Sequence, residues 1–343
     1  MTSGQLSSAR LEFDSWNEVV EGFMDRGWTD GLPIIPPTPD LVNACLDAGG
    51  RNPSDILATE PTKGRVITAE KVAVNAVMAG CKPEYFKVVA AAVEAMSEPQ
   101  FNLHAITAST QGSALLALVN GPVAKEIGLN SGVSVFGPGH RANATIGRAI
   151  RLVVINATGS RSGEIDKATL GHPGKYTWCM AEAEDVSPWE PFQANRGFSE
   201  EQSTITLFPA LSPIQVDNHA FQRPEEILVS FREAMFAGGG GWNQGEVVVV
   251  LCPEHVGNLE RAGWSKEQVR EFLHDSARRP IDEWRAAGRY IRDDVGQPGD
   301  ELHSLNSSEG ISIVVAGGGA GAFSCVIPLW SGGIGARSVT RLI

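Results

Sequence analysis

The sequence predicts an α/β fold with mixed or mostly parallel sheets and flanking helices. Apolar runs at 246–251 and 311–316 are short and rich in valine and isoleucine, which is typical of strands buried inside a sheet. Segments with the apolar spacing of helices, such as 68–79 and 265–277, alternate with such runs along the chain. Alternation of strands and helices favours a sheet that is covered by helices.

Helices are expected to dominate the first hundred residues. We expect them at 15–26, 68–79 and 83–96. Thr68 is a favourable N-cap for the second of these helices, and Gly80 follows it as a common C-terminal stop residue. Between the first two helices, the prolines of segment 28–38 forbid regular helix and predict an extended chain.

Strands are predicted in the middle of the chain. We expect them at 102–108, 114–120 and 133–136, where aliphatic and β-branched residues predominate. The last of them leads into a glycine turn and a helix. Segment 160–200 is rich in loops and contains a turn followed by an alternating strand that ends at Glu182.

The last third of the chain alternates more clearly between strands and helices. We expect strands at 204–208, 246–251 and 311–316, and helices at 224–236 and 265–277. A run of Pro, Asn, Arg and Gly before residue 200 indicates a domain boundary. We therefore expect a tail and helix at 1–27, an N-terminal α/β domain at 28–198, and a smaller parallel α/β domain at 199–343. No internal repeat is evident.

Composition and charge limit the classes of function. The chain has 343 residues, of which 42% are hydrophobic, and a formal net charge of −12. Such an acidic surface repels a phosphate backbone, so nucleic acid is not an expected partner. No apolar stretch approaches the roughly 20 residues of a membrane span, and the polar N-terminus lacks an apolar signal core, so we expect a cytoplasmic protein. Five scattered cysteines without a Cys-x-x-Cys pair argue against a disulfide framework.

The segment GPGHRANATIGRAIR (137–151) predicts a binding site for an anion. A tight glycine turn opens directly into a helix, and helix N-termini carry unpaired N–H groups and partial positive charge. Arg141, Thr145 and Arg148 lie on one face of that helix. We predict that the segment binds substrate through Gly137, Gly139, Arg141, Asn143, Thr145 and Arg148.

Candidate catalytic residues lie in and near this segment. His140, inside the turn, is predicted to transfer protons. The candidate nucleophile is Cys179, in the strand after the turn at 171–175, or Cys81, which is followed by Lys82. Cys252 is a further candidate, because it ends a buried strand and precedes a helix N-terminus that can stabilise a thiolate. A buried structural role is the alternative interpretation of each cysteine.

Cofactor motifs are weak. The histidines lack metal-binding spacing, although a scattered divalent metal site built from His104, His140 and a carboxylate is a second hypothesis. The sequence GGGAGA (317–322) formally fits the dinucleotide fingerprint, but Pro328 interrupts the helix that the fingerprint requires. This loop can instead form a backbone cradle for a smaller ligand at the end of a strand.

Several blocks together resemble a known group of bacterial proteins. They are WTDGLP (28–33), NAVMAGCKPEY (75–85), FNLH (101–104), the segment 137–148 and GHPGKYTWCMAE (171–182). The chain resembles largely uncharacterised bacterial proteins related to the UGSC-type selenoprotein or thiol-protein families. The selenocysteine-Gly-Ser-Cys signature of those families is replaced here by AFSC (322–325), so the resemblance implies no catalytic residue in this chain.

The expected function is that of an enzyme acting on a small polar or anionic organic molecule. Hydrolase or lyase chemistry is preferred to redox chemistry, because no nicotinamide, flavin or dithiol signature is convincing. A metal-dependent hydrolase with scattered histidine ligands is the first alternative. The second is a noncatalytic subunit that docks a partner through its glycine-rich C-terminal segment. We expect a homo-oligomer or a hetero-oligomer in either case.

Overall fold

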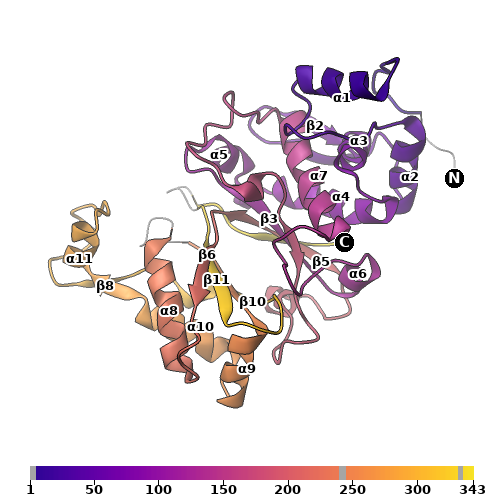
Figure 1. Cartoon of the computed structure of the whole chain (residues 1–343). Helices are drawn as coiled ribbons and strands as arrows, with labels where there is room; N and C mark the ends of the chain where they lie inside the picture. Colours follow the sequence, from indigo (N-terminus) through magenta and orange to yellow (C-terminus); the bar gives the residue numbers. More distant parts are fainter. Residues whose placement is uncertain (1–4, 239–244, 331–334) are drawn as a thin grey trace.

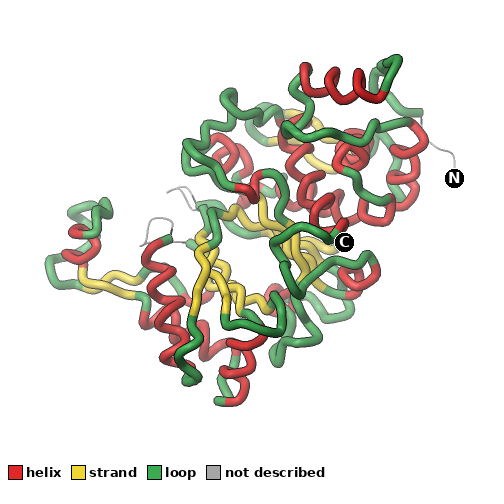
Figure 2. Tube along the Cα trace, viewed as in Figure 1, coloured by secondary structure: helices red, strands yellow, loops and turns green. Residues whose placement is uncertain are grey.

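The computed structural model describes residues 5–238, 245–330 and 335–343. The strands of its two larger sheets lie in the middle of the molecule, and most helices lie on two opposite outer sides (Figure 1; Figure 2). Two four-stranded sheets face each other across an apolar core. The layers therefore run helices, sheet, sheet, helices, and the predicted α/β class is confirmed.

Both sheets mix parallel and antiparallel strands. The first sheet has the order β4-β3-β5-β12, with strands Cys179–Ala181, Ala114–Asn120, Thr204–Ala210 and Val339–Leu342. The second has the order β10-β7-β11-β6, with strands Ile311–Val315, Val247–Leu251, Phe323–Pro328 and Ile214–Asp217. In each sheet only the first pair in this order is parallel. The expectation of a parallel C-terminal sheet therefore needs correction to a mixed one.

The strands of the two sheets follow the same pattern of parallel and antiparallel pairs. One edge strand of each sheet comes directly after a strand of the other sheet in the chain. After β5, the chain leaves the first sheet and forms β6 at the edge of the second. After β11, the chain leaves the second sheet and forms β12 at the edge of the first. Strands β5 and β12 both follow residue 199, so the predicted boundary between 198 and 199 does not separate the two sheets.

The first helix layer covers the outer face of the first sheet. It consists mainly of α1 (Trp16–Asp25), α2 (Pro39–Gly49), α3 (Ala69–Ala79), α4 (Phe86–Met96) and α7 (Arg141–Thr158). Along β3, Leu115, Ala117 and Val119 face these helices, and the residues between them face the second sheet. This alternation follows from the two-residue period of a strand. It buries both faces of the sheet.

The second helix layer covers the outer face of the second sheet. It consists of α8 (Pro224–Ala237), α9 (Pro253–Arg261), α10 (Lys266–Ser276) and α11 (Ile281–Ala286). Shorter elements complete the fold: α5 (Leu103–Ala108), α6 (Pro122–Glu126), and the antiparallel pairs β1 (Ile56–Glu60) with β2 (Arg65–Thr68) and β8 (Arg278–Pro280) with β9 (Glu301–His303).

Two predicted strands are absent from the described structure. The segment at 102–108 forms helix α5, which Asn102 begins with a left-handed φ of 55°. Short apolar runs fit a buried strand and a buried helix equally well, so periodicity could not separate them. The segment at 133–136 is a turn, in which Ser134 has a φ of 57° and Val133 is exposed. A left-handed residue cannot continue a strand.

Candidate functional site

The two arginines of the predicted anion site already have partners. Arg148 forms a bidentate pair with Asp30 at 2.8 Å for both bonds, and it also donates to the carbonyls of Leu32 and Pro33. Arg141 donates twice to the carbonyl of Gly80, at 3.1 and 2.9 Å. These bonds fasten α7 to the extended N-terminal segment and to the end of α3.

The other residues predicted to bind substrate also make structural contacts. The Asn143 amide bonds the backbone N–H and carbonyl of Asn130 and the carbonyl of Cys179. The Thr145 hydroxyl donates to the carbonyl of Arg141. A side chain at Gly137 would have to displace the hydroxyl of Ser134. Gly139 has a φ of 111°. Substrate binding by these residues stays a prediction.

The predicted catalytic residues are brought together only in part. His140 is the N-cap of α7, and its side chain makes no capping hydrogen bond. Cys81 and Cys179 are both buried beneath α7, where Cys81 Sγ bonds the carbonyl of Thr145. Burial raises the pKa of Cys81 to about 12 and raises the pKa of Cys179 as well. Both surroundings therefore disfavour a thiolate.

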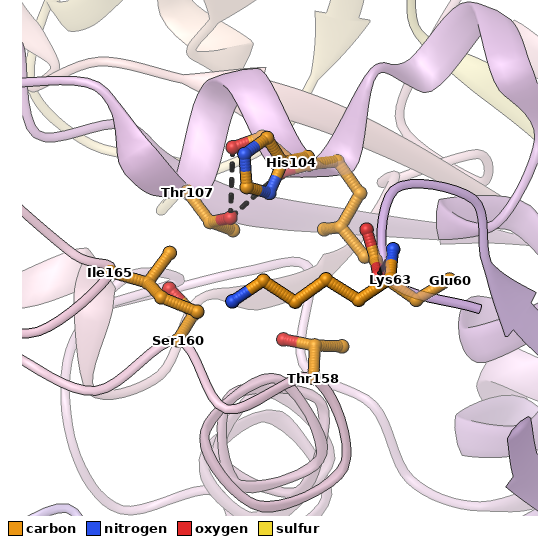
Figure 3. A pocket seen from close by; sticks show the side chains of 8 residues that line it. Glu60, Lys63, His104, Thr107, Thr158, Ser160 and Ile165 are labelled. Carbon is orange, nitrogen blue, oxygen red and sulfur yellow. Dashed lines mark hydrogen bonds between the residues drawn. The ribbon is translucent and has the colours of Figure 1, made fainter. Parts of the chain in front are cut away.

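His104 lies at a cavity at the C-terminal end of α7. The cavity opens to solvent and is lined by Glu60, Lys63, Leu103, His104, Thr107, Thr158, Ser160 and Ile165. Figure 3 shows the Lys63 side chain extending across it toward Thr158 and Ser160. The carbonyl end of a helix favours a cation. The ammonium of Lys63 therefore suits this position.

Among residues 5–238, 245–330 and 335–343, no three His, Cys, Asp or Glu side chains lie close enough together to hold a metal ion. The predicted metal ligands are split between α5, which carries His104, and the N-terminus of α7, where His140 lies. Within the same part of the chain, every helix is too short or too polar to span a bilayer.

A different site lies where the two parallel strands of the second sheet end. Strands β7 and β10 are neighbours and parallel, so their carboxyl ends meet at one edge. Cys252 follows β7 and begins α9, and Gly317 follows β10 after Ala316. A Cβ built on Gly317 would lie 3.9 Å from Cβ of Cys252. In α/β sheets this edge is where ligands bind.

The sequence CPEH (252–255) places a cysteine and a histidine in the first turn of α9. Cys252 is the N-cap residue with extended backbone, and Pro253 fits the first helical position, where no N–H is needed. The Cys252 side chain makes no capping hydrogen bond, but His255 follows at position N3 and its interaction with the sulfur lowers the thiol pKa. The i, i+3 spacing at the helix start thus places the histidine beside the thiol.

Ser324 and Asn218 fix the orientation of the His255 ring. Nε2 lies 3.2 Å from the carbonyl oxygen of Asn218, which can only accept, so Nε2 carries the hydrogen. Nδ1 lies 2.7 Å from Ser324 Oγ and therefore accepts the hydrogen of that hydroxyl. Ser324 Oγ also accepts the N–H of Cys252 at 2.9 Å. One hydroxyl thereby holds both members of the pair.

The electrostatics of Cys252 differ from those of the other cysteines. Burial raises the pKa of the Cys252 thiol, but hydrogen bonds from His255 and Ser324 outweigh burial and bring that pKa below its ordinary value. Burial lowers the pKa of His255, but its interaction with Cys252 prevails and raises it. Burial raises the pKa of Cys45 to about 11 and that of Cys325 to about 12. Cys252 is the cysteine whose thiolate is stabilised.

Sequence reasoning missed His255, Ser324 and Asn218. A cysteine three residues before a histidine, directly after the apolar run at 247–251, was the signal available for His255. Ser324 belongs to the AFSC segment and lies on β11, 72 positions from Cys252. Only the pairing of β11 with β7 brings it to the thiol. Comparison with protein-family models, with curated proteins and with solved structures found no match to this chain.

Proposed function

We propose that the protein is a hydrolase that attacks a small polar or anionic organic substrate with the thiolate of Cys252. The observation that carries this proposal is the placement of Cys252 at the N-terminus of α9, where one hydroxyl, that of Ser324, contacts both the N–H of Cys252 and Nδ1 of His255. Thiolates near an imidazolium and a helix N-terminus are the reactive form of cysteine in enzymes. The proposal therefore places the anion-binding pocket at the start of α9 and not at the start of α7, where the sequence predicted it.

The proposed reaction is acyl transfer to sulfur followed by hydrolysis. His255 Nδ1 takes the thiol proton, and Sγ forms a bond to the carbonyl carbon of the substrate. The bond from that carbon to the leaving group then breaks, and the leaving group takes the proton from Nδ1. Water next attacks the thioester and gives a proton to Nδ1, and the acid and the thiol are released. Atoms and charges balance without a cofactor.

Backbone donors are available for the developing oxyanion. The loop GGGAGA (317–322) follows β10 beside Cys252, and the N–H groups of Gly318, Gly319 and Ala320 find no acceptor within the described part of the chain. Unpaired backbone N–H groups near a nucleophile stabilise a tetrahedral oxyanion. This arrangement supports the cradle predicted for the glycine-rich loop.

Trapping of an acyl-enzyme tests the proposal. The protein is incubated with p-nitrophenyl acetate, and the acetylated residue is located by mass spectrometry after proteolysis. The proposal predicts an early burst of p-nitrophenolate and an acetyl group on Cys252. Both are lost in Cys252→Ser and His255→Ala but retained in Cys325→Ala. Acetylation that is absent from Cys252, or that is unchanged in His255→Ala, contradicts the proposal and favours a noncatalytic subunit.

A further inference from the structure

The Cys252 thiol is buried beside the glycine-rich loop. Cys252 is only 3% exposed, although its interactions with His255 and Ser324 lower the thiol pKa. The loop at 317–322 runs from β10 to β11, and Gly317 lies beside Cys252. A substrate cannot bond to the sulfur while the residue is this buried. Access therefore requires a neighbouring segment to move.

Two side chains fasten the far end of the loop. Glu254 Oε2, in the first turn of α9, accepts the N–H of Gly321 at 2.9 Å. His219 Nε2 accepts the N–H of Ala322 at 3.2 Å. Asp217 Oδ1 lies 2.5 Å from Nδ1 of His219 and accepts its hydrogen, which leaves Nε2 as the acceptor. Both contacts are single bonds near solvent, because His219 and Glu254 are exposed.

The near end of the loop is fixed more firmly. The N–H of Gly317 donates to the carbonyl of Ser131 at 2.8 Å, and a Cβ on Gly318 would lie 3.1 Å from Val133 Cγ2. Gly317 and Gly321 have φ values of 114° and 96°, which side chains rarely adopt. Glycines at both ends permit the large backbone rotations that a hinge needs. The three residues between them make no hydrogen bond through their N–H groups within the described chain.

We propose that the loop at 317–322 is a lid over Cys252, and that Glu254 and His219 hold it closed until substrate enters. This inference rests on the function proposed above, because it takes Cys252 as the reacting group. The lid turns about Gly317 and Gly321, and breaking the bonds that Glu254 and His219 accept releases the loop as far as Ala322, whose carbonyl still accepts the N–H of Asn218. Opening exposes the sulfur and also frees the N–H groups of Gly321 and Ala322 as donors to the substrate.

The rate of Cys252 alkylation by iodoacetamide measures how often the lid opens. Rates are compared at the pH plateau of each variant, where the thiol is fully ionised, so that changes in thiol pKa do not enter. Glu254→Ala and His219→Ala should each raise the plateau rate by up to about tenfold, since each removes one hydrogen bond from the closed state. The double variant should react faster than either single variant.

Matched variants distinguish the opening of the lid from effects of lost charge and of lost stability. Glu254→Gln and His219→Gln keep an acceptor oxygen, so their plateau rates should stay within about twofold of the wild-type rate. An unchanged plateau rate in the double alanine variant, with an unchanged melting temperature, overturns the lid. If the pKa of the Cys252 thiol is not lowered, the proposed function is contradicted instead. The comparison of plateau rates tests the lid whatever the value of that pKa.

Discussion

At the scale of residues, the reactivity of Cys252 depends on groups contributed by three elements. His255 comes from α9, Ser324 from β11, and Asn218 from the chain after β6. Each makes a contact that the others cannot replace. His255 supplies the base, Ser324 positions it against the sulfur, and the carbonyl of Asn218 selects the tautomer.

Replacing His255 should move the ionisation of Cys252 to higher pH. The interaction with the imidazole, which lowers the thiol pKa most, is lost in His255→Ala, while the burial that raises it remains. The alkylation rate at pH 7 should fall by about tenfold or more, because each unit of pKa changes the thiolate fraction about tenfold below the midpoint. The measurement is the pH profile of Cys252 alkylation, followed by mass spectrometry.

Ser324→Ala provides a graded version of the same test. It removes the hydroxyl that contacts both Cys252 and His255 but leaves the imidazole in place. The midpoint should shift in the same direction as in His255→Ala and by a smaller amount. Cys325→Ala, at the adjacent position in β11, should leave the midpoint unchanged because Cys325 faces the core between the sheets. A larger shift in Cys325→Ala than in Ser324→Ala contradicts this account.

The sequence allowed only part of this residue-scale description. Cys252 could be selected because a strand end followed by Pro253 indicates a helix N-terminus, which stabilises a thiolate. Ser324 could not be selected, since nothing in the sequence predicts the register of β11 against β7. The partners of Arg141 and Arg148 could not be predicted for a related reason. Their partners are carbonyls and Asp30, which no sequence spacing reveals.

At the scale of elements, Arg148 joins α7 to the extended segment that precedes α2. Its guanidinium pairs with Asp30, whose side chain is 4% exposed, and with two backbone carbonyls. Arg148→Ala leaves Asp30 buried without its partner. We expect a loss of about 3 kcal/mol in the free energy of unfolding, since removing one member of a buried pair costs about 3–5 kcal/mol.

Denaturant unfolding checks the Arg148→Ala prediction. Lys125→Ala is the matched control, because Lys125 also pairs with a carboxylate, that of Asp185, but both side chains are largely exposed. The control should unfold close to wild type. If Arg148→Ala keeps wild-type stability but weakens binding of a substrate, the anion site at the start of α7 would be correct and the structural role wrong.

Elements with long apolar periodicity were the ones that the sequence predicted well. The helices α3, α4 and α8 and the strands β3, β7 and β10 were all expected close to their observed positions. The segment at 102–108 became α5 because Asn102 turns the chain and the preceding residues already form a helical turn at Pro99–Phe101. A run of six or seven residues does not contain enough periods to distinguish helix from strand.

At the scale of the whole molecule, β6 and β12 link the two sheets. Strand β6 follows β5 of the first sheet but pairs in the second, and β12 follows β11 of the second sheet but pairs in the first. Val339 on β12 is 5% exposed and packs in the core of the first helix layer, although it belongs to the end of the chain. Val339→Asp should destabilise the protein by more than about 3 kcal/mol, because it buries an unpaired charge.

Leu342→Asp is the control for Val339→Asp. Leu342 lies on the same strand and is 49% exposed, so its replacement should change stability by no more than about 0.5 kcal/mol. Thermal melting of both variants is the measurement. Equal melting temperatures would mean that β12 does not belong to the first sheet. This pairing could not be predicted from the sequence, since β5 and β12 are separated by 134 positions at Thr206 and Thr340.

The central claim is that Cys252 is the reactive cysteine, and the direct test is the alkylation of all five cysteines in the wild-type protein. Iodoacetamide modification is followed by mass spectrometry for each site from about pH 5 to about pH 9, across the ordinary range of thiol ionisation. We predict that Cys252 is modified with a midpoint below the ordinary thiol pKa, and that Cys45, Cys81, Cys179 and Cys325 stay unmodified while the protein is folded. Faster modification of Cys81 or Cys179, or a Cys252 midpoint at or above the ordinary thiol pKa, would contradict it.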